Sequence, residues 1–175
     1  HKQGRINGAV IKNELTGKEL TVKAKTVINA CGPWVDNLRK KEGSLNGKQL
    51  LLTKGVHLVV DHTKIPIKAS VYFDVPTDKR MIFAIPRDGK VYIGTTDTVY
   101  GDEEDVNYPF ANKADAEYIL AATNFMFPTI DLTIDDVEST WAGLRPLIHE
   151  EGKSPSEVSR KDEIFLSRSK LISIA

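Results

Sequence analysis

Alternating apolar and polar positions recur along most of the chain and predict a strand-rich fold. Residues 5–31 have the pattern of a β-hairpin, with its turn at Thr16 and Gly17, that continues into a third strand ending in VINA. The same signals predict further strands at 55–61, 69–75 and 136–147, and in two short stretches near the end of the chain, EIFLSRS and LISIA.

The strongest local signals are one hairpin and one helix. Residues 80–97 alternate on both sides of Asp88 and Gly89, a pair suited to a two-residue turn with positive φ. Residues 112–127 carry apolar side chains at helical spacing, with Asn112 as the expected N-cap, and a proline ends the pattern. Many strands with about two helices indicate an α+β fold, in which a mixed or antiparallel sheet is flanked by helices.

Composition narrows the class of protein without identifying it. The chain has 175 residues, 41% of them hydrophobic, which is enough for one ordinary domain with its own core. Its 24 basic residues balance its 24 acidic residues, so there is no support for broad attraction to nucleic acid or to a membrane surface. Cys31 is the single cysteine, which excludes an internal disulfide and favours a reducing compartment. No apolar run approaches the ~20 residues of a membrane-spanning helix.

Common catalytic motifs are absent from the sequence, so any chemistry must depend on single residues placed by strands. There is no P-loop, no GxGxxG, no GxSxG and no Cys/His cluster with metal-ligand spacing. Arg145, in WAGLRPL, interrupts an apolar strand, and Pro146 holds it in an extended conformation. Such a guanidinium needs either an acidic partner within the protein or an anionic ligand, and its planar fork suits phosphate or carboxylate.

Three other segments carry candidate chemistry, each with a simpler structural reading. His57, in KGVHLVV, is either a hydrogen-bonded core residue or a proton acceptor. Arg160, in SPSEVSR, is either a solvated loop residue or part of a cation site. The stretch GTTD places the hydroxyls of Thr95 and Thr96 before a carboxylate, as a capped turn also would.

Two glycines raise the question of what approaches the backbone. The strand in VINACGPWVD stops abruptly at Gly32 and Pro33, and a glycine there lets another molecule come close because no side chain intervenes. That molecule is either more protein or a cofactor. Gly55, which directly follows Lys54, is interpreted as part of a turn.

Taken together, five segments resemble the flavin-dependent glycerol-3-phosphate dehydrogenases of bacteria. They are VINACGPWVD, TKGVHLVV, IFAIPRDGKVYIGTTD, WAGLRPL and SPSEVSR, which occur in the family's order and cover nearly all of the chain from residue 20 on. The broader family is that of the D-amino-acid-oxidase-like flavoproteins, whose flavin domain is assembled from discontinuous segments. The resemblance implies that the backbone of Ala30, Cys31 and Gly32 approaches FAD and that Trp34 lies beside it.

The same resemblance implies oxidation of sn-glycerol 3-phosphate to dihydroxyacetone phosphate, with hydride transfer to FAD and onward electron transfer to a quinone. Arg145 and Arg160 would bind the substrate phosphate, His57 would be the general base, and Thr95 and Thr96 would lie nearby. The family also implies a cytoplasmic location, peripheral to the inner face of the cell membrane.

The chain is expected to be an internal piece of such an enzyme. Residues 1–45 would belong to a Rossmann-like FAD-binding domain, residues 46–170 to the substrate-binding domain, and residues 171–175 to a strand returning to the FAD domain. The family's dinucleotide fingerprint and the lysine of its Gly-Gly-Lys segment are not among these 175 residues. The piece alone is therefore expected to bind FAD poorly and to be inactive.

Three alternatives remain open at this point. A glycerol-3-phosphate oxidase would pass its electrons to oxygen, although the bridge from His149 to Arg160 is shorter than the insertion that several such oxidases carry there. A non-catalytic anion-binding module of the same fold would also lack the fingerprint and the lysine. An amine or 2-hydroxy-acid oxidase would use Arg145 for a carboxylate.

Overall fold

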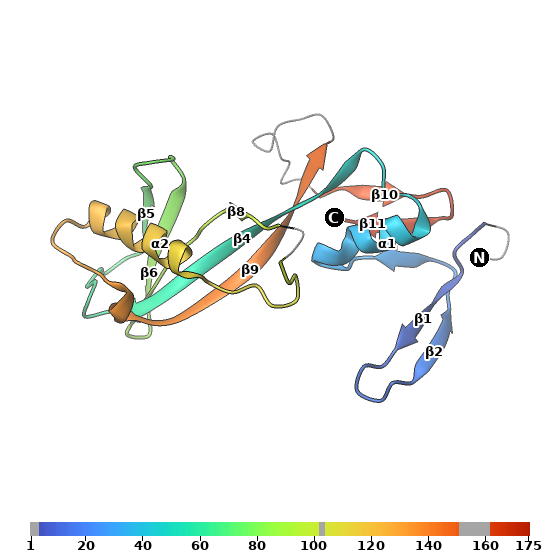
Figure 1. The fold of residues 1–175 in the computed structure, drawn as a ribbon, viewed down its shortest axis with the longest axis horizontal. Coiled ribbons are helices and arrows are strands. Elements are labelled where there is room, and N and C mark those ends of the chain that lie inside the picture. Colours follow the sequence, from blue (N-terminus) through green and yellow to red (C-terminus); the bar gives the residue numbers. More distant parts are fainter. Residues whose placement is uncertain (1–3, 102–103, 151–161) are drawn as a thin grey trace. The chain divides into compact units, whose positions relative to one another are not determined.

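A computed structural model of the chain describes residues 4–101, 104–150 and 162–175 (Figure 1). Strands form most of the regular structure in these ranges, together with two α-helices and two short 3-10 helices, and the predicted α+β class is confirmed. Within the described ranges, no helix has the length and apolar character needed to cross a membrane.

The chain divides into two compact units. Unit 1 consists of His1–Leu51 with Pro146–Ala175, and unit 2 of Leu52–Arg145. The chain passes from one unit to the other within β4 (Lys48–Asp61) and within β9 (Val137–Glu150). The domain limits expected from the sequence, at 45/46 and 170/171, concern functional domains and stay a prediction.

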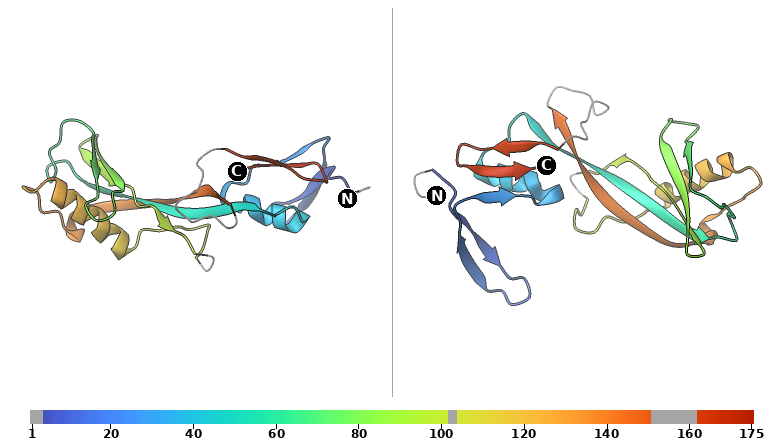
Figure 2. Two further views of the ribbon diagram at one scale, coloured as in Figure 1. Left: turned by 90° about the horizontal axis from the view of Figure 1, so that it is seen from above. Right: turned by 180° about the vertical axis from the view of Figure 1, so that it is seen from behind.

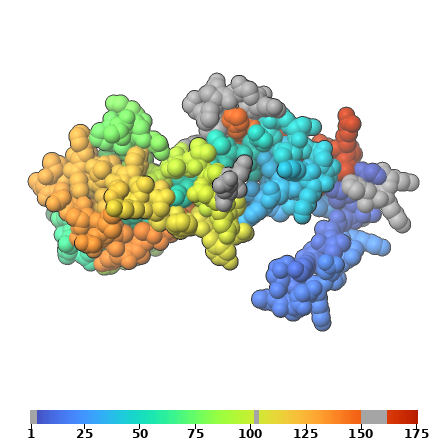
Figure 3. Space-filling view, in the orientation of Figure 1, coloured from blue at the N-terminus to red at the C-terminus, as the bar shows by residue number. Residues whose placement is uncertain are grey.

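The predicted N-terminal hairpin is present in unit 1. Strand β1 (Gly8–Lys12) pairs antiparallel with β2 (Glu19–Lys23), so that Ile11 faces Leu20 across the ladder. The side chains of both residues are more than half exposed, and the space-filling view shows the hairpin standing clear of the rest of its unit (Figure 3).

A three-stranded sheet forms the other part of unit 1. Its central strand β11 (Leu171–Ile174) pairs antiparallel with β10 (Ile164–Leu166) and parallel with β3 (Val27–Asn29). The carboxyl ends of β3 and β11 therefore lie side by side, although 144 residues separate Asn29 from Ser173 in the sequence.

A short helical segment follows β3. A 3-10 helix (Gly32–Trp34) leads directly into α1 (Val35–Glu42), which ends at Gly43 with a left-handed φ of 83°.

Unit 2 is organised around a six-stranded sheet with the order β5-β6-β7-β4-β8, in which β9 also pairs with β4. Its remaining strands are β5 (Val71–Asp74), β6 (Met81–Arg87), β7 (Lys90–Gly94) and β8 (Thr98–Val99). The β6–β7 hairpin turns at Asp88 and Gly89, whose φ angles of 52° and 75° confirm the predicted turn.

Helix α2 (Lys113–Met126) covers one face of this sheet (Figures 1 and 2). The apolar core between them includes Val56, Leu58, Val60, Ile82, Val91, Ile93, Ile119 and Leu120. Asn112 caps the helix as predicted, since its side chain accepts a hydrogen bond from the backbone of Asp115 at 3.0 Å. The carboxylate of Asp115 also forms a buried ion pair of 2.7 Å with Lys54 on β4, which ties the first turn of α2 to the sheet.

Candidate functional site

The guanidinium of Arg145 lies directly on the backbone of Gly55. A Cβ placed on Gly55 would be 2.6 Å from Nη2 and 2.7 Å from Nη1 of Arg145, so that a side chain at this position would force the charged group to move. Gly55 lies inside β4, and the prediction that Lys54 and Gly55 form a turn is wrong. The alternation of the strand points Lys54 toward α2 and Gly55 toward the opposite face of the sheet.

The segment after β7 holds the guanidinium of Arg145 in one orientation. Nη2 donates to the hydroxyl of Thr95 at 3.0 Å, and Nη1 donates to the carbonyl of Thr96 at 3.1 Å and to Asp97 Oδ1 at 3.4 Å. In the part of the chain that the structure describes, these bonds use three of the five N–H donors of the guanidinium. The side chain is 33% exposed, so it is less buried than its apolar strand suggested, and it combines an acidic partner with an open side.

Thr96 differs from its neighbour because its side chain is buried. Its hydroxyl accepts a hydrogen bond from the backbone of Val56 at 3.1 Å and donates one to the carbonyl of Lys54 at 3.0 Å. This hydroxyl continues the pairing of β4 beyond the end of β7. Thr96 thereby positions the segment that carries Thr95 and Asp97, and direct contact of its side chain with a substrate stays a prediction.

His57 lies beside Arg145 on the same face of the sheet. Its ring stacks on Trp141 with 4.8 Å between centroids and 13° between planes. Burial of the imidazole, followed by the positive charge of Arg145, lowers the pKa of His57 below its ordinary value. Nδ1 is buried and has no hydrogen-bond partner within the described ranges, which leaves Nε2 as the nitrogen available to a bound molecule.

These residues line one shallow hollow of about 200 Å³, here called the Arg145 hollow. Its lining consists of Gly55, His57, Trp141, Gly143, Leu144 and Arg145. One side therefore offers a fixed cation and the adjoining side a neutral imidazole. Such a pair can bind an anionic group and accept a proton from an atom a short distance away.

The residues predicted to contact the cofactor lie together in unit 1. Ala30 and Cys31 are exposed after the end of β3, and Trp34 is 37% exposed. Gly32 has a left-handed φ of 56°, which explains the glycine by backbone conformation, and nothing in the described chain occupies the position of its missing Cβ. The carboxyl ends of parallel strands, where these residues lie, are a common place for ligands.

Arg160 falls outside the described residues, so its predicted role in substrate binding stays a prediction.

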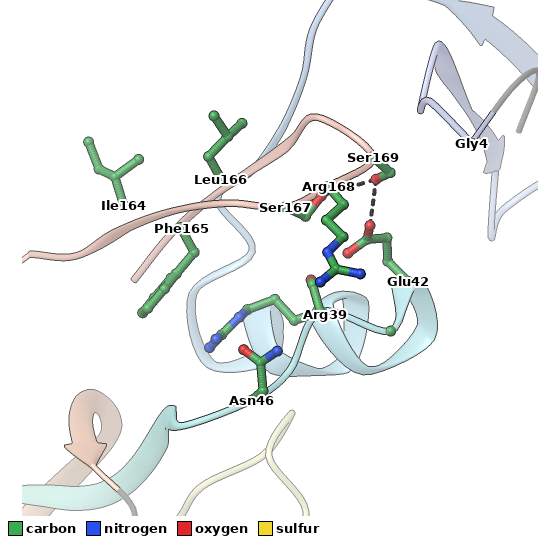
Figure 4. Close-up of a pocket in the computed structure, with 12 residues that line it drawn as sticks. Gly4, Arg39, Glu42, Asn46, Ile164, Phe165, Leu166, Ser167, Arg168 and Ser169 are labelled. Atoms are coloured by element: carbon green, nitrogen blue, oxygen red, sulfur yellow. Dashed lines mark hydrogen bonds between the residues drawn. The ribbon is translucent and has the colours of Figure 1, made fainter.

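A larger hollow of about 780 Å³ lies in unit 1, between α1 and the β10–β11 hairpin (Figure 4). Arg39 lies beneath it, with 1% of the residue exposed. Its guanidinium donates to Asp36 at 2.7 Å and lies 4.0 Å from the centre of the Phe165 ring. Glu42 accepts a hydrogen bond from Ser169 across the same hollow. None of the residues predicted from the sequence lines it, and these contacts tie α1 to the sheet.

Sequence reasoning missed several residues in and around the Arg145 hollow. Gly55 and Gly94 lie inside or at the end of strands, where a glycine can indicate close approach of another group, and that signal was available. Trp141 lies in the motif WAGLRPL, but nothing in the sequence indicated that it stacks on His57. The pairing of Asp97 with Arg145 depends on two strands that are far apart in the sequence.

Comparison with known proteins identifies the family of the chain. Residues 2–165 match the family described as FAD dependent oxidoreductase. Aerobic glycerol-3-phosphate dehydrogenase of Bacillus subtilis is 55% identical over 175 residues, and that of Staphylococcus aureus is 52% identical over 174 residues. The chain spans 31% of the length of each of these relatives.

Solved structures show the same relationship. The glycerol-3-phosphate dehydrogenase from Bacillus halodurans, complexed with FAD, superposes with a TM-score of 0.88 at 55% identity and covers 100% of this chain and 33% of its own. The L-alpha-glycerophosphate oxidase from Mycoplasma pneumoniae, with FAD bound, has a TM-score of 0.62 over 94% of this chain and 44% of its own, and at 18% identity shares the fold alone. The family suggested by the sequence motifs is thereby confirmed, and the chain belongs to the FAD-dependent oxidoreductases.

Proposed function

We propose that the protein containing this chain oxidises sn-glycerol 3-phosphate to dihydroxyacetone phosphate, with FAD as the hydride acceptor. In this proposal, the chain supplies most of the substrate-binding side of the enzyme. The observation that carries it is the guanidinium of Arg145, held on the bare backbone of Gly55 beside the imidazole of His57. Relatives with more than half of their aligned residues identical are named for this reaction.

Arg145 would bind the phosphate of the substrate. A guanidinium presents its N–H donors in a plane that matches two phosphate oxygens, and such charge-assisted bonds are stronger than neutral ones. Because Thr95 and the carbonyl of Thr96 already fix the orientation of Arg145, little side-chain freedom remains to be lost on binding. Anchoring the phosphate would place the C2 hydroxyl of the same small molecule near His57. Arg160 as a second phosphate ligand is part of the same proposal.

His57 would act as the general base. Its lowered pKa keeps the imidazole neutral at neutral pH, which is the form able to accept a proton. Nε2 would take the proton of the C2 hydroxyl while the hydrogen on C2 leaves as hydride. FAD, when bound, supplies the acceptor for that hydride.

The residues after β3 fit a cofactor that approaches the backbone. The chain turns there through Gly32, and the space beside this glycine is open within the described residues. Asn29 at the end of β3 holds the turn, since its side-chain amide donates to the carbonyl of Val35 at 2.9 Å. Ala30, Cys31, Gly32 and Trp34 are proposed to contact FAD.

The electron acceptor is proposed to be a quinone, with the enzyme in the cytoplasm and peripheral to the membrane. Dehydrogenase names among the most similar relatives favour this acceptor over oxygen. Formation of hydrogen peroxide during turnover in air, in stoichiometric amount with the product, would identify an oxidase instead. Isolated residues 1–175 are proposed to be inactive, and a stable flavin spectrum from that piece with turnover of the substrate would contradict this.

A substitution of Arg145 tests the substrate assignment. In the FAD-loaded protein that contains this chain, Arg145→Ala is expected to raise the KM for glycerol 3-phosphate by about 10- to 100-fold, because charge-assisted hydrogen bonds to the phosphate are lost. Slow oxidation of glycerol, which has no phosphate, should not change. The matched control is Arg87→Ala, which removes an exposed arginine at the β6–β7 hairpin. An unchanged KM in Arg145→Ala would contradict the assignment.

A further inference from the structure

The ring of His57 lies between Trp141 and Gly94. Trp141 comes from β9 and Gly94 from β7, the two strands that pair with β4 on either side of His57. The indole of Trp141 stacks on the imidazole. A Cβ on Gly94 would be 2.6 Å from Cδ2 and 2.9 Å from Cγ of His57, and 2.8 Å from the carbonyl oxygen of Val56. The imidazole therefore occupies part of the space that a side chain at position 94 would fill.

Trp141 is itself held in place from the side. Tyr92, on β7, meets the indole edge to face, with 5.3 Å between ring centroids and 82° between planes. The indole nevertheless remains 45% exposed, so it is not retained as part of the apolar core under α2. Its ring contacts in the described chain are with His57 and Tyr92, and it borders the Arg145 hollow.

We propose that Trp141 and Gly94 form a slot that fixes the plane of the His57 imidazole, and that Trp141 is a positioning residue for proton transfer. The proposal rests on the proposed function, in which His57 is the base. Without the slot, rotation about the side-chain bonds of His57 would carry Nε2 away from the position of the C2 hydroxyl. General-base catalysis depends on this geometry as well as on the pKa of the base.

The charged and titratable groups around His57 influence its pKa. Arg145 on β9 is the neighbouring cation, Asp97 after β7 pairs with that cation, and the phenol of Tyr92 lies beyond Trp141. Trp141 carries no charge and acts on His57 by covering it. Removal of the indole should therefore raise the pKa of His57 toward its ordinary value, because water regains access to the ring.

Two substitutions of Trp141 in the FAD-loaded protein test the proposal. Trp141→Leu is expected to lower kcat by about 10- to 100-fold, with little change in the KM for glycerol 3-phosphate, since the base is misplaced while the phosphate site is intact. Trp141→Phe keeps a flat ring and should restore most of the rate. The control Tyr72→Leu removes another exposed aromatic stack, 4.7 Å from Phe83, and should leave kcat unchanged.

A titration of His57 provides a readout that does not depend on turnover. In protein with isotopically labelled histidine, NMR should show the midpoint of His57 moving to higher pH in Trp141→Leu and remaining near the parent value in Trp141→Phe.

The outcomes separate the two proposals. Unchanged kcat and an unchanged His57 titration in Trp141→Leu would overturn the slot, as would equal losses in Trp141→Leu and Trp141→Phe. If the parent protein fails to oxidise glycerol 3-phosphate but the titration of His57 shifts as expected, the proposed function fails and the slot stands.

Discussion

Arg145 and His57 affect each other through charge. The guanidinium lowers the pKa of the imidazole, in addition to the effect of burial, and its own environment supplies one carboxylate, Asp97, at 3.4 Å. A bound phosphate would bring further negative charge to the guanidinium. The same anion that anchors the substrate would therefore change the basicity of the residue beside it.

Phosphate binding is accordingly expected to raise the pKa of His57. The sign follows from the cause, since an anion paired with Arg145 offsets the positive charge that disfavours imidazolium. NMR titration of labelled histidine, with and without saturating inorganic phosphate, should show a midpoint at higher pH when phosphate is bound. In Arg145→Met, phosphate should produce no such change. A midpoint that phosphate leaves unmoved in the parent protein would argue against coupling between the two residues.

The residues of the Arg145 hollow were predictable to different degrees. Arg145 and His57 could be identified because a charged or titratable side chain in an apolar strand is conspicuous. Gly55 and Gly94 carried a signal of close approach, because a glycine within a strand can mark it. Which groups these glycines and Trp141 contact could not be predicted, since that depends on which strand lies alongside. Thr96 was expected near a substrate, which stays a prediction, and the bonds of its hydroxyl to the backbone of β4 could not be foreseen from the sequence.

At the scale of elements, the hollow depends on the close pairing of β4 with β9. Gly55 on β4 has no side chain, and the guanidinium from β9 lies over it within 3 Å of the missing Cβ. On the face of the sheet that packs against α2, the ion pair between Lys54 and Asp115 fixes β4 to the helix. The strand is thus held from one face while it supports Arg145 on the other.

Gly55→Ala tests this arrangement. The new Cβ would lie 2.6–2.8 Å from three guanidinium atoms of Arg145, so the charged group must move. We expect the KM for glycerol 3-phosphate to rise about 10-fold, equivalent to about 1.4 kcal/mol of lost binding. Gly101→Ala is a suitable control, because among the described residues its Cβ would meet Glu104 alone, at an ordinary 3.6 Å. A KM that stays at the parent value in Gly55→Ala would show that Arg145 need not lie on Gly55.

Elements with local signals were predicted well, and those set by distant pairing were not. The hairpin at Asp88 and Gly89 and the cap at Asn112 each depend on a few adjacent residues, and both are confirmed. The start of β4 at Lys48 was missed because its first residues lack clear alternation. The parallel pairing of β3 with β11 joins strands more than 140 residues apart, which no local pattern reports.

At the scale of the whole molecule, the chain accounts for about a third of its relatives. It contributes a six-stranded sheet in unit 2 and a strand-to-helix turn in unit 1, and both carry residues assigned to one proposed reaction. The family motifs predicted this division of roles, which stays a prediction, and each motif alone was moderate evidence for the family. Their order along the chain made the family recognisable, and the residue contacts then supported individual roles.

The central claim is that the protein containing this chain transfers hydride from glycerol 3-phosphate to FAD. The most direct test is anaerobic addition of glycerol 3-phosphate to the FAD-loaded protein while the visible flavin absorption is followed. We predict rapid bleaching that glycerol alone does not cause, because Arg145 needs the phosphate to place the C2 carbon. A flavin that stays oxidised in fully loaded protein would contradict the claim and would favour a substrate that presents a carboxylate to Arg145.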